Sequence, residues 1–176
     1  IIIQPNFRLC YKEYFDDYFI LLRPRDIVSG DFYWFTKHKG RTIVAAADCT
    51  GHGVAGGLMS MLGVSFLNEI VNVRNIISPE TILQKLREMI IVALDQKSHN
   101  NAILSGIDIS IISVNEEKSK LEFAGANNPI YLIRNNELIE YPGEKMPISL
   151  YQYMKPFSKK SIDIKREDQI YMFTDG

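Results

Sequence analysis

The sequence contains only two cysteines, Cys10 and Cys49, which are too few for a disulfide framework and do not stand in a C-x-x-C pattern. It also lacks an excess of charge, because 20 basic residues nearly balance 21 acidic ones and leave a net charge of −1. Surfaces that bind nucleic acid carry blocks of Lys and Arg, so we expect no nucleic-acid partner. The low number of cysteines favours a reducing, cytoplasmic location.

Long apolar runs are missing as well. No run reaches the roughly 20 residues of a membrane span, so we expect no membrane insertion by this segment. The opening Ile1-Ile2-Ile3 is too short for a signal peptide and has no basic flank. Neither G-x-G-x-x-G nor G-x-x-x-x-G-K-[ST] occurs, which disfavours a nucleotide-binding α/β domain. With 46% hydrophobic and 23% charged residues, the composition is typical of one globular domain.

Two apolar runs, Asp31–Lys37 and Thr42–Asp48, flank Lys39-Gly40, a good two-residue hairpin turn. With that turn, residue 37 pairs with residue 42, and Asp31 faces Asp48. Directly opposed residues have Cβ atoms about 4.5–5.5 Å apart, and two carboxylates that close repel unless something positive lies between them. The spacing indicates a cation site at the mouth of a sheet. The alternative, that both Asp are turn and cap residues, stays open.

The hairpin is apolar on both faces, which predicts a central layer that is covered on each side. One face carries Phe32, Trp34, Ile43 and Ala45, and the other carries Tyr33, Phe35, Val44 and Ala46. Before it, Asp17–Arg23 reads as a first buried strand, because it is rich in aromatic and β-branched residues.

A helical pattern follows the hairpin over Val54–Val73, with Leu58, Met61, Leu62, Phe66 and Ile70 at three- and four-residue steps. A second helix opens at Ser78-Pro79, where Ser suits the N-cap and Pro the first helical position. Further strands are predicted at 107–114, 120–124, 129–134, 137–141, 161–164 and 169–174.

Five motifs, taken in order, resemble the SpoIIE-like branch of the PPM (2C-type) metal-dependent serine/threonine protein phosphatases. They are Ser29-Gly30-Asp31-Phe32-Tyr33, Ala47-Asp48-Cys49-Thr50-Gly51-His52-Gly53, Gly106-Ile107-Asp108, Phe123-Ala124-Gly125-Ala126-Asn127-Asn128-Pro129 and Phe173-Thr174-Asp175-Gly176. The resemblance implies an α+β fold, an α-β-β-α sandwich of two mostly antiparallel sheets flanked by helices. Residues 17–176 would be the phosphatase domain, with its C-terminal part missing, and residues 1–16 a linker or the end of an upstream segment.

The same resemblance implies a site with two Mn²⁺ or Mg²⁺ ions in the complete domain. Its ligands would be Asp31, Asp48, Asp175 and the backbone carbonyl of Cys49, and hard oxygen ligands of this kind suit both ions. The three aspartates would act through a water that the metals activate, with Asp48 as the bridging ligand. Asp108 would lie near the metals without being a principal ligand. Arg25 is a candidate to grip the phosphate.

The implied activity is hydrolysis of phosphoserine or phosphothreonine on a bacterial signalling protein, which in this family is often an anti-sigma-factor antagonist. An upstream sensor domain is implied as a partner, and a homodimer stays open. The family places a further metal-binding Asp beyond Thr174-Asp175-Gly176, so we expect these 176 residues alone to be inactive or very weakly active. The alternative function is a catalytically silent PPM-fold binding and switching module.

Overall fold

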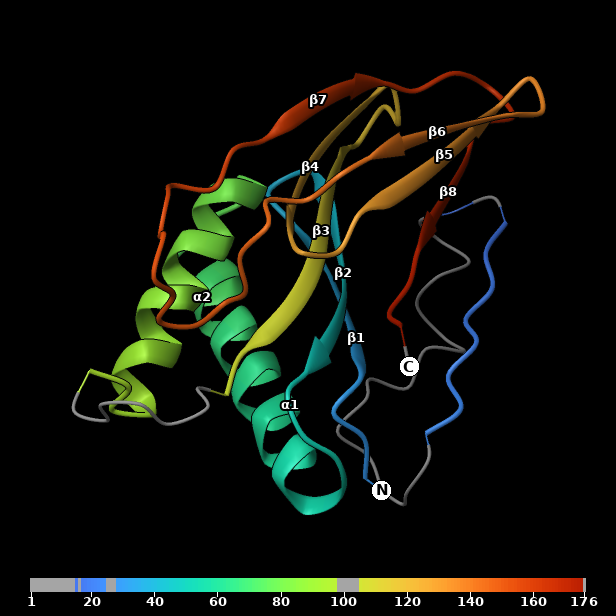
Figure 1. The fold of residues 1–176 in the computed structure, drawn as a ribbon. Helices are drawn as coiled ribbons and strands as arrows, with labels where there is room; N and C mark the ends of the chain where they lie inside the picture. The colour runs from blue at the N-terminus through green and yellow to red at the C-terminus, as the bar shows by residue number, and fades with distance from the viewer. Residues whose placement is uncertain (1–14, 16, 25–27, 98–104, 176) are drawn as a thin grey trace.

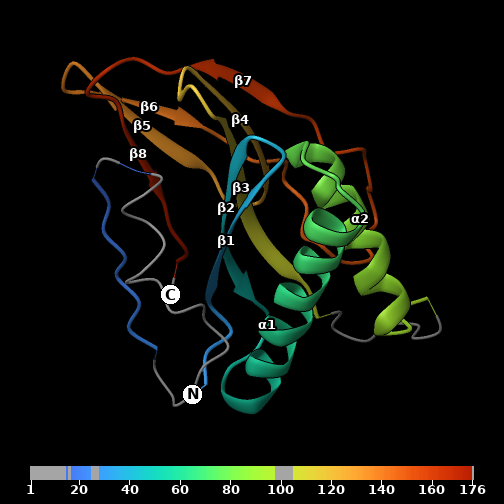
Figure 2. The same ribbon diagram turned by 180° about the vertical axis from the view of Figure 1, so that it is seen from behind.

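Two antiparallel sheets pack on each other in the computed structural model, and two helices cover the outer face of the larger sheet (Figures 1 and 2). The structure describes residues 15, 17–24, 28–97 and 105–175. The larger sheet has the order β1-β2-β3-β4-β7, with strands Phe32–His38, Arg41–Cys49, Ile107–Asn115, Lys120–Ala126 and Lys160–Asp163. The smaller sheet has the order β6-β5-β8, with strands Glu137–Tyr141, Ile130–Arg134 and Gln169–Met172. The helices are α1 (Gly53–Asn68), its π-helical continuation η3 (Glu69–Val73) and α2 (Pro79–Ala93).

The predicted α+β class and its two antiparallel sheets are confirmed, and both helices begin close to the predicted residues. Within the described residues, helices cover only the larger sheet. Three of the four layers of the expected sandwich are therefore present in this part of the chain.

The β1–β2 hairpin has the predicted register. Lys37 pairs with Thr42 and Phe32 with Ala47, so Asp31 and Asp48 follow as the next positions along the two strands. The turn residues Lys39 and Gly40 have φ of 50° and 69°. Positive φ at both central positions is the geometry of a type I′ turn, whose twist matches that of the flanking strands.

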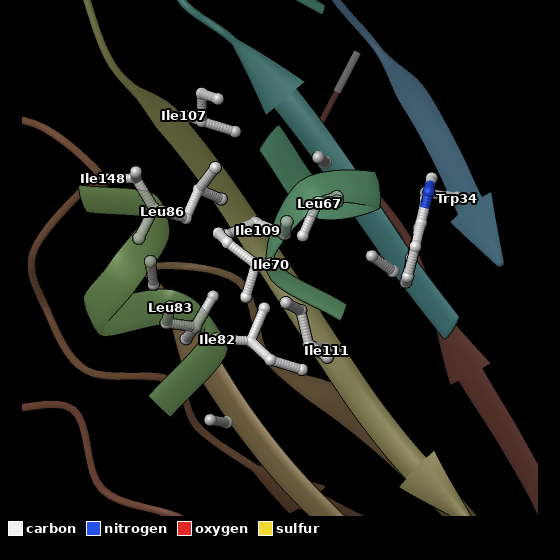
Figure 3. Close-up of a cluster of buried hydrophobic side chains, with 14 of the residues drawn as sticks. Trp34, Leu67, Ile70, Ile82, Leu83, Leu86, Ile107, Ile109, Ile111 and Ile148 are labelled. Atoms are coloured by element: carbon white, nitrogen blue, oxygen red, sulfur yellow. The ribbon is translucent and has the colours of Figure 1, made fainter. Parts of the chain in front are cut away.

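The first hydrophobic core lies between the helices and the larger sheet. Figure 3 shows Trp34 of β1, Ile109 and Ile111 of β3, and Leu67 of α1 meeting there. The second core lies between the two sheets and is built from Ile112, Val114, Leu121, Phe123, Ile130, Leu132 and Ile162.

The prediction that both faces of the β1–β2 hairpin are buried was only half right. Phe32, Trp34, Ile43 and Ala45 are buried, whereas Tyr33, Phe35, Val44 and Ala46 on the other face are only partly buried. The reason is that the smaller sheet packs over β3, β4 and β7. Of the hairpin's residues, Val44 alone is among the partly buried side chains that pack against this second core.

The predicted apolar face of the helix was only partly right. Ile70 is buried, and Leu62 and Phe66 are partly buried against the core, but Leu58 and Met61 are 58% and 50% exposed. The residues that α1 buries are Gly56, Gly57, Met59, Ser60, Gly63 and Leu67. A Cβ added at Gly63 would lie 2.9 Å from a ring carbon of Phe32, so the glycine face allows the close approach of helix to sheet. Ranking residues by hydrophobicity could not anticipate a face chosen for its lack of side chains.

The N-terminal strand predicted over Asp17–Arg23 was also wrong. These residues form no strand, and the apolar side chains from Tyr18 to Leu22 are exposed, with Phe19 at 73%. The segment runs beside β8 (Figures 1 and 2), where the ring of Phe19 lies 6.1 Å from that of Tyr171. The composition was that of a strand, but no β-ladder forms here.

The helix formed by α1 and η3, Gly53–Val73, is long and apolar enough to cross a membrane by length and composition, with a mean hydropathy of 1.5. Of its apolar window, 44% is buried inside the fold, and core helices of globular proteins meet the same test. This is weak evidence for a span. The expected lack of membrane insertion stays a prediction.

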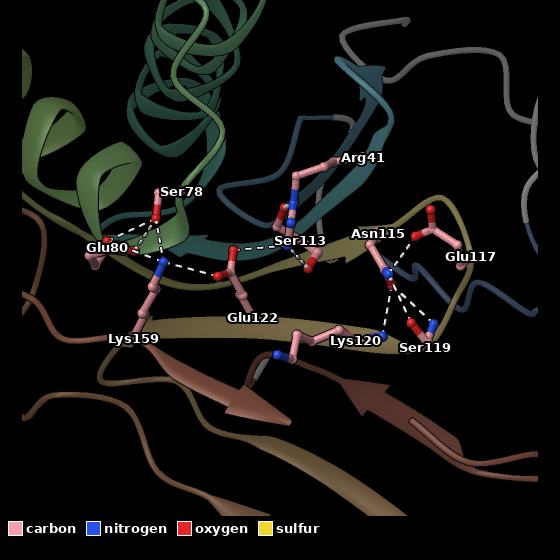
Figure 4. Close-up of polar contacts among 10 residues, drawn as sticks. All are labelled: Arg41, Ser78, Glu80, Ser113, Asn115, Glu117, Ser119, Lys120, Glu122 and Lys159. Carbon is pink, nitrogen blue, oxygen red and sulfur yellow. Dashed lines mark hydrogen bonds and ion pairs between the residues drawn. The ribbon is translucent and has the colours of Figure 1, made fainter. Parts of the chain in front are cut away.

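A polar network joins the strands to the start of α2 at the end of β2 farthest from Asp48 (Figure 4). Arg41 Nη2 lies 2.8 Å from Glu122 Oε2, and its Nε donates to Ser113 Oγ at 2.6 Å. Lys159 Nζ lies 2.9 Å from Glu122 Oε1 and donates to Ser78 Oγ at 3.1 Å. The positive and negative groups at this end neutralise one another.

Three asparagines on and just after the α1–η3 helix bind side chains of the edge strand β1. Trp34 Nε1 donates to Asn68 Oδ1 at 3.1 Å, and Thr36 Oγ1 donates to Asn72 Oδ1 at 3.0 Å. His38 Nε2 lies 2.9 Å from Asn75 Oδ1. Alternate residues of a strand share one face, so each step along this face of β1 meets one asparagine.

Replacing Asn68 by Ala should destabilise the fold by about 1–2 kcal/mol, because it leaves the indole N–H of the buried Trp34 without its acceptor. Asn72→Ala is the matched control, since its bonds are exposed, and it should cost less than about 0.5 kcal/mol. Urea unfolding of both variants would measure the difference. Equal losses would contradict a special role for the Trp34–Asn68 bond.

Candidate metal centre

Three aspartates lie at the same end of three neighbouring strands. Asp31 directly precedes β1, Asp48 is the last but one residue of β2, and Asp108 is the second residue of β3. Asp48 and Asp108 are direct partners in the β2–β3 ladder. The antiparallel register therefore brings together carboxylates that are up to 77 residues apart in the sequence.

Asp175 joins this group from the second sheet. It follows β8 and lies close enough to Asp48 to raise the pKa of that carboxyl. The structure thus brings together the three aspartates that the sequence singled out, Asp31, Asp48 and Asp175. Arg25, the candidate phosphate ligand, lies outside the described residues.

The backbone around Asp31 is fixed by contacts with the middle of α1 and with the end of β2. Asp31 N donates to Ser29 Oγ at 3.0 Å, and Ser60 Oγ of α1 donates to Ser29 O at 3.1 Å. A Cβ added at Gly30 would lie 2.8 Å from the carbonyl oxygen of Cys49. Only Gly fits at this close approach, which is a physical reason for the Ser-Gly-Asp order at this point.

Burial and like charge act together on Asp48. Its pKa is raised to about 6, first by burial, then by the charge of Asp31, and further by Asp175 and Asp108. Burial also raises the pKa of Asp108. None of the ion pairs between described residues includes any of these four carboxylates. This end of the two sheets, with Asp31, Asp48, Asp108 and Asp175, is called the mouth below. It concentrates negative charge, and no basic side chain of the described residues forms an ion pair with it.

These residues fit a hard divalent cation by their chemistry. All the side-chain donors are carboxylate oxygens, and the buried Oδ1 of Asp31 has no hydrogen-bond partner. Buried polar atoms are rarely left unpaired, so an orphaned carboxylate oxygen is consistent with a cation ligand. In the described part of the chain, no three His, Cys, Asp or Glu side chains are already arranged to hold an ion. The carboxylates are neighbours rather than a finished coordination sphere, and their roles as ligands stay predictions.

The sequence did not predict one contact at this site, between Asn127 and Asp108. Asn127 Nδ2 donates to Asp108 Oδ1 at 2.8 Å. Both residues stand in motifs that carried the family resemblance, but nothing in their spacing predicts that the two side chains meet. Asp48 and Asp108 are also partners in the β2–β3 ladder. The sequence does not predict this pairing, because two helices separate the strands and no local turn sets their register.

Comparison with known proteins supports this account of the fold. The family model described as Stage II sporulation protein E (SpoIIE) matches residues 38–176. Among solved structures, the SiaA-PP2C domain of Pseudomonas aeruginosa is 27% identical, with a TM-score of 0.77 over 90% of this chain. The chain spans 60% of that domain's length. A comparison with curated protein sequences gave no match.

Two further structures share the fold at lower identity. The PP2C phosphatase domain of SpoIIE from Bacillus subtilis, solved with a fragment of its regulatory domain, is 19% identical with a TM-score of 0.67, covering 86% of this chain and 42% of that one. RsbX in complex with magnesium is 14% identical with a TM-score of 0.58, covering 84% of this chain and 67% of that one. With its family model matched over residues 38–176 and its sheets arranged as in these domains, the chain belongs to the SpoIIE family of PP2C-type phosphatase domains.

Proposed function

We propose that this chain is the larger part of a metal-dependent phosphatase domain that hydrolyses phosphoserine or phosphothreonine on a signalling protein. The observation that carries this is the meeting of Asp31, Asp48 and Asp175 at one mouth, without an ion pair from the described residues. The membership of the SpoIIE family supports the reaction class. The partners we propose are a phosphorylated regulator, such as an anti-sigma-factor antagonist, and an upstream sensor domain.

The residues that would hold Mn²⁺ or Mg²⁺ are Asp31, Asp48, Asp175 and the carbonyl of Cys49. Divalent ions supply a nucleophilic water at neutral pH and neutralise phosphoryl charge. The magnesium in the related RsbX structure supports this class of ion. The protein's own contribution is to hold Asp48 between carboxylates from two sheets, in partly buried surroundings where an ion is attracted strongly. No described side chain at this mouth is needed as a covalent nucleophile.

One observation favours the alternative function, a catalytically silent binding and switching module. Val54, Leu58 and Met61 form an exposed apolar stripe on α1, directly after the Asp48 turn. Exposed apolar patches often mark interaction sites. Such a surface is compatible with a regulated enzyme as well, so the activity assay below separates the two functions.

The full-length protein should hydrolyse a phosphoserine peptide in a Mn²⁺-dependent reaction, and Asp48→Asn should lower the rate by at least about a hundredfold, since the central ligand is lost. Asp163→Asn is the control, because Asp163 is exposed at the end of β7 and pairs with Lys120, far from the mouth. Release of phosphate measures both rates. Absent hydrolysis, together with undetectable Mn²⁺ binding by calorimetry, would favour the switching module.

Asp48→Asn should also stabilise the metal-free protein at pH 7.5. The folded-state pKa of Asp48, about 6, lies above the ordinary 3.8, so the stability linked to its protonation is complete below pH 3.8 and lost as the pH rises through 6. Asn keeps the neutral form. After discounting for solvent screening of a partly exposed group, the gain is about 1 kcal/mol, or roughly 2–4 °C in Tm.

Thermal unfolding in EDTA at pH 5 and pH 7.5 tests this second expectation. The gain should be larger at pH 7.5, and Asp163→Asn should show no such difference. A wild-type protein that is more stable than Asp48→Asn at pH 7.5 would show that the ionised Asp48 carboxylate does not destabilise the metal-free fold.

A further inference from the structure

Asn127 lies beside the four aspartates of the candidate site and contacts one of them, Asp108. It lies directly after β4 and donates from Nδ2 to Asp108 Oδ1 at 2.8 Å. Asp108 in turn faces Asp48 in the β2–β3 ladder. Asn127 thus touches the residue next to the central aspartate, and any effect it has on the mouth must pass through Asp108.

The backbone of Asn127 is tightly fixed. Its φ is 58°, in the left-handed region that Asn tolerates better than most residues. Its N–H donates to the carbonyl of Glu144 at 2.8 Å, and Glu144 N–H donates to the carbonyl of Gly125 at 2.8 Å. A Cβ added at Gly125 would lie 2.3 Å from Asn128 O. These contacts fix the direction of the Asn127 side chain before any ligand arrives.

The same stretch of backbone also fixes Asp108. Ile148 N–H donates to the carbonyl of Ile107 at 2.8 Å, and Ile107 N–H donates back to Ile148 at 3.3 Å. Residues 143–149 therefore brace the start of β3 on one side and the turn with Asn127 on the other. A donor and an acceptor held by one rigid segment are preorganised for each other.

Only one oxygen of Asp108 is used in this contact. Among the hydrogen bonds of the described residues, Oδ1 accepts from Asn127, and none ends on Oδ2. A carboxylate whose orientation is fixed through one oxygen keeps the other for a further interaction. Ligands of metal sites are commonly oriented by outer hydrogen bonds of this kind, and losing one costs about 10–100-fold in metal affinity.

We propose that Asn127 is a positioning residue of the metal centre, which holds Asp108 beside Asp48 so that Asp108 acts as a fourth carboxylate of the site. This inference rests on the proposed function, because it assumes that the mouth binds a divalent ion. It extends that function by giving Asp108 a direct part in holding the ion and by naming the residue that orients it.

The test is calorimetric titration of Mn²⁺ into the metal-free full-length protein. Asn127→Ala should bind Mn²⁺ about tenfold more weakly than the wild type. Asn136→Ala is the matched control: Asn136 is also exposed and has a φ of 63°, but it lies in the β5–β6 turn. Both variants replace an Asn at positive φ by Ala, which tolerates this backbone conformation less well. Similar Tm values in EDTA would therefore show that a difference in Mn²⁺ affinity does not come from a difference in stability.

A double-mutant cycle then shows whether Asn127 acts through Asp108. Asp108→Ala should weaken Mn²⁺ binding by at least about tenfold, and adding Asn127→Ala to it should cause no further loss. Wild-type affinity in Asn127→Ala, or a full additional loss in the double variant, would overturn the inference.

The outcomes separate this inference from the proposed function. A wild-type protein that binds Mn²⁺ and obeys the cycle but hydrolyses no phosphopeptide would overturn only the proposed function. If the wild-type protein hydrolyses the phosphopeptide but Asn127→Ala leaves the Mn²⁺ affinity unchanged, only the inference is overturned. A wild-type protein that binds no Mn²⁺ would overturn both.

Discussion

The register of three neighbouring strands is the constraint on which the candidate site depends. A type I′ turn at Lys39-Gly40 sets β1 against β2, and the β2–β3 ladder then places Asp48 opposite Asp108. A slip of one residue in either ladder would turn a whole set of side chains to the other face of the sheet. The buried Trp34 and Ile43 oppose such a slip, because it would expose them. The hydrophobic core thereby keeps the carboxylates in place.

The concentration of carboxylates works against the stability of the fold that holds it. Burial, and after it repulsion by the neighbouring carboxylates, raises the pKa of Asp48 to about 6, so its ionised form destabilises the fold at neutral pH. The opposite end of the same strands differs, since Arg41, Glu122 and Lys159 neutralise one another there. The two hydrophobic cores and the ion pairs at the opposite end offset the free-energy cost of these neighbouring carboxylates. Strongly perturbed carboxyl groups in a polar mouth are typical of functional sites rather than of structural ion pairs.

The sequence was most informative where a local rule decides the structure. A two-residue turn, alternating apolar runs and a Ser-Pro helix start predicted the strands, the register of the first hairpin and α2. It failed where distant partners decide. The buried face of α1 follows from how closely Gly63 lets the helix approach Phe32, and the segment from Asp17 to Arg23 has a strand's composition without a ladder. The contact of Asn127 with Asp108 depends on a brace from residues 143–149, which no periodicity reveals.

The two sheets contribute unequally to the site, and this links ion binding to the packing between them. Asp31, Asp48 and Asp108 lie at one end of the larger sheet, whereas Asp175 follows β8 of the smaller one. The second core, which includes Phe123 and Leu132 from opposite sheets, therefore sets how near Asp175 comes to Asp48. An ion held by carboxylates from both sheets would favour their docked arrangement, because binding to the native state alone stabilises it. The packing of this core would then help to set the geometry of the candidate metal site, although none of its side chains can bind an ion.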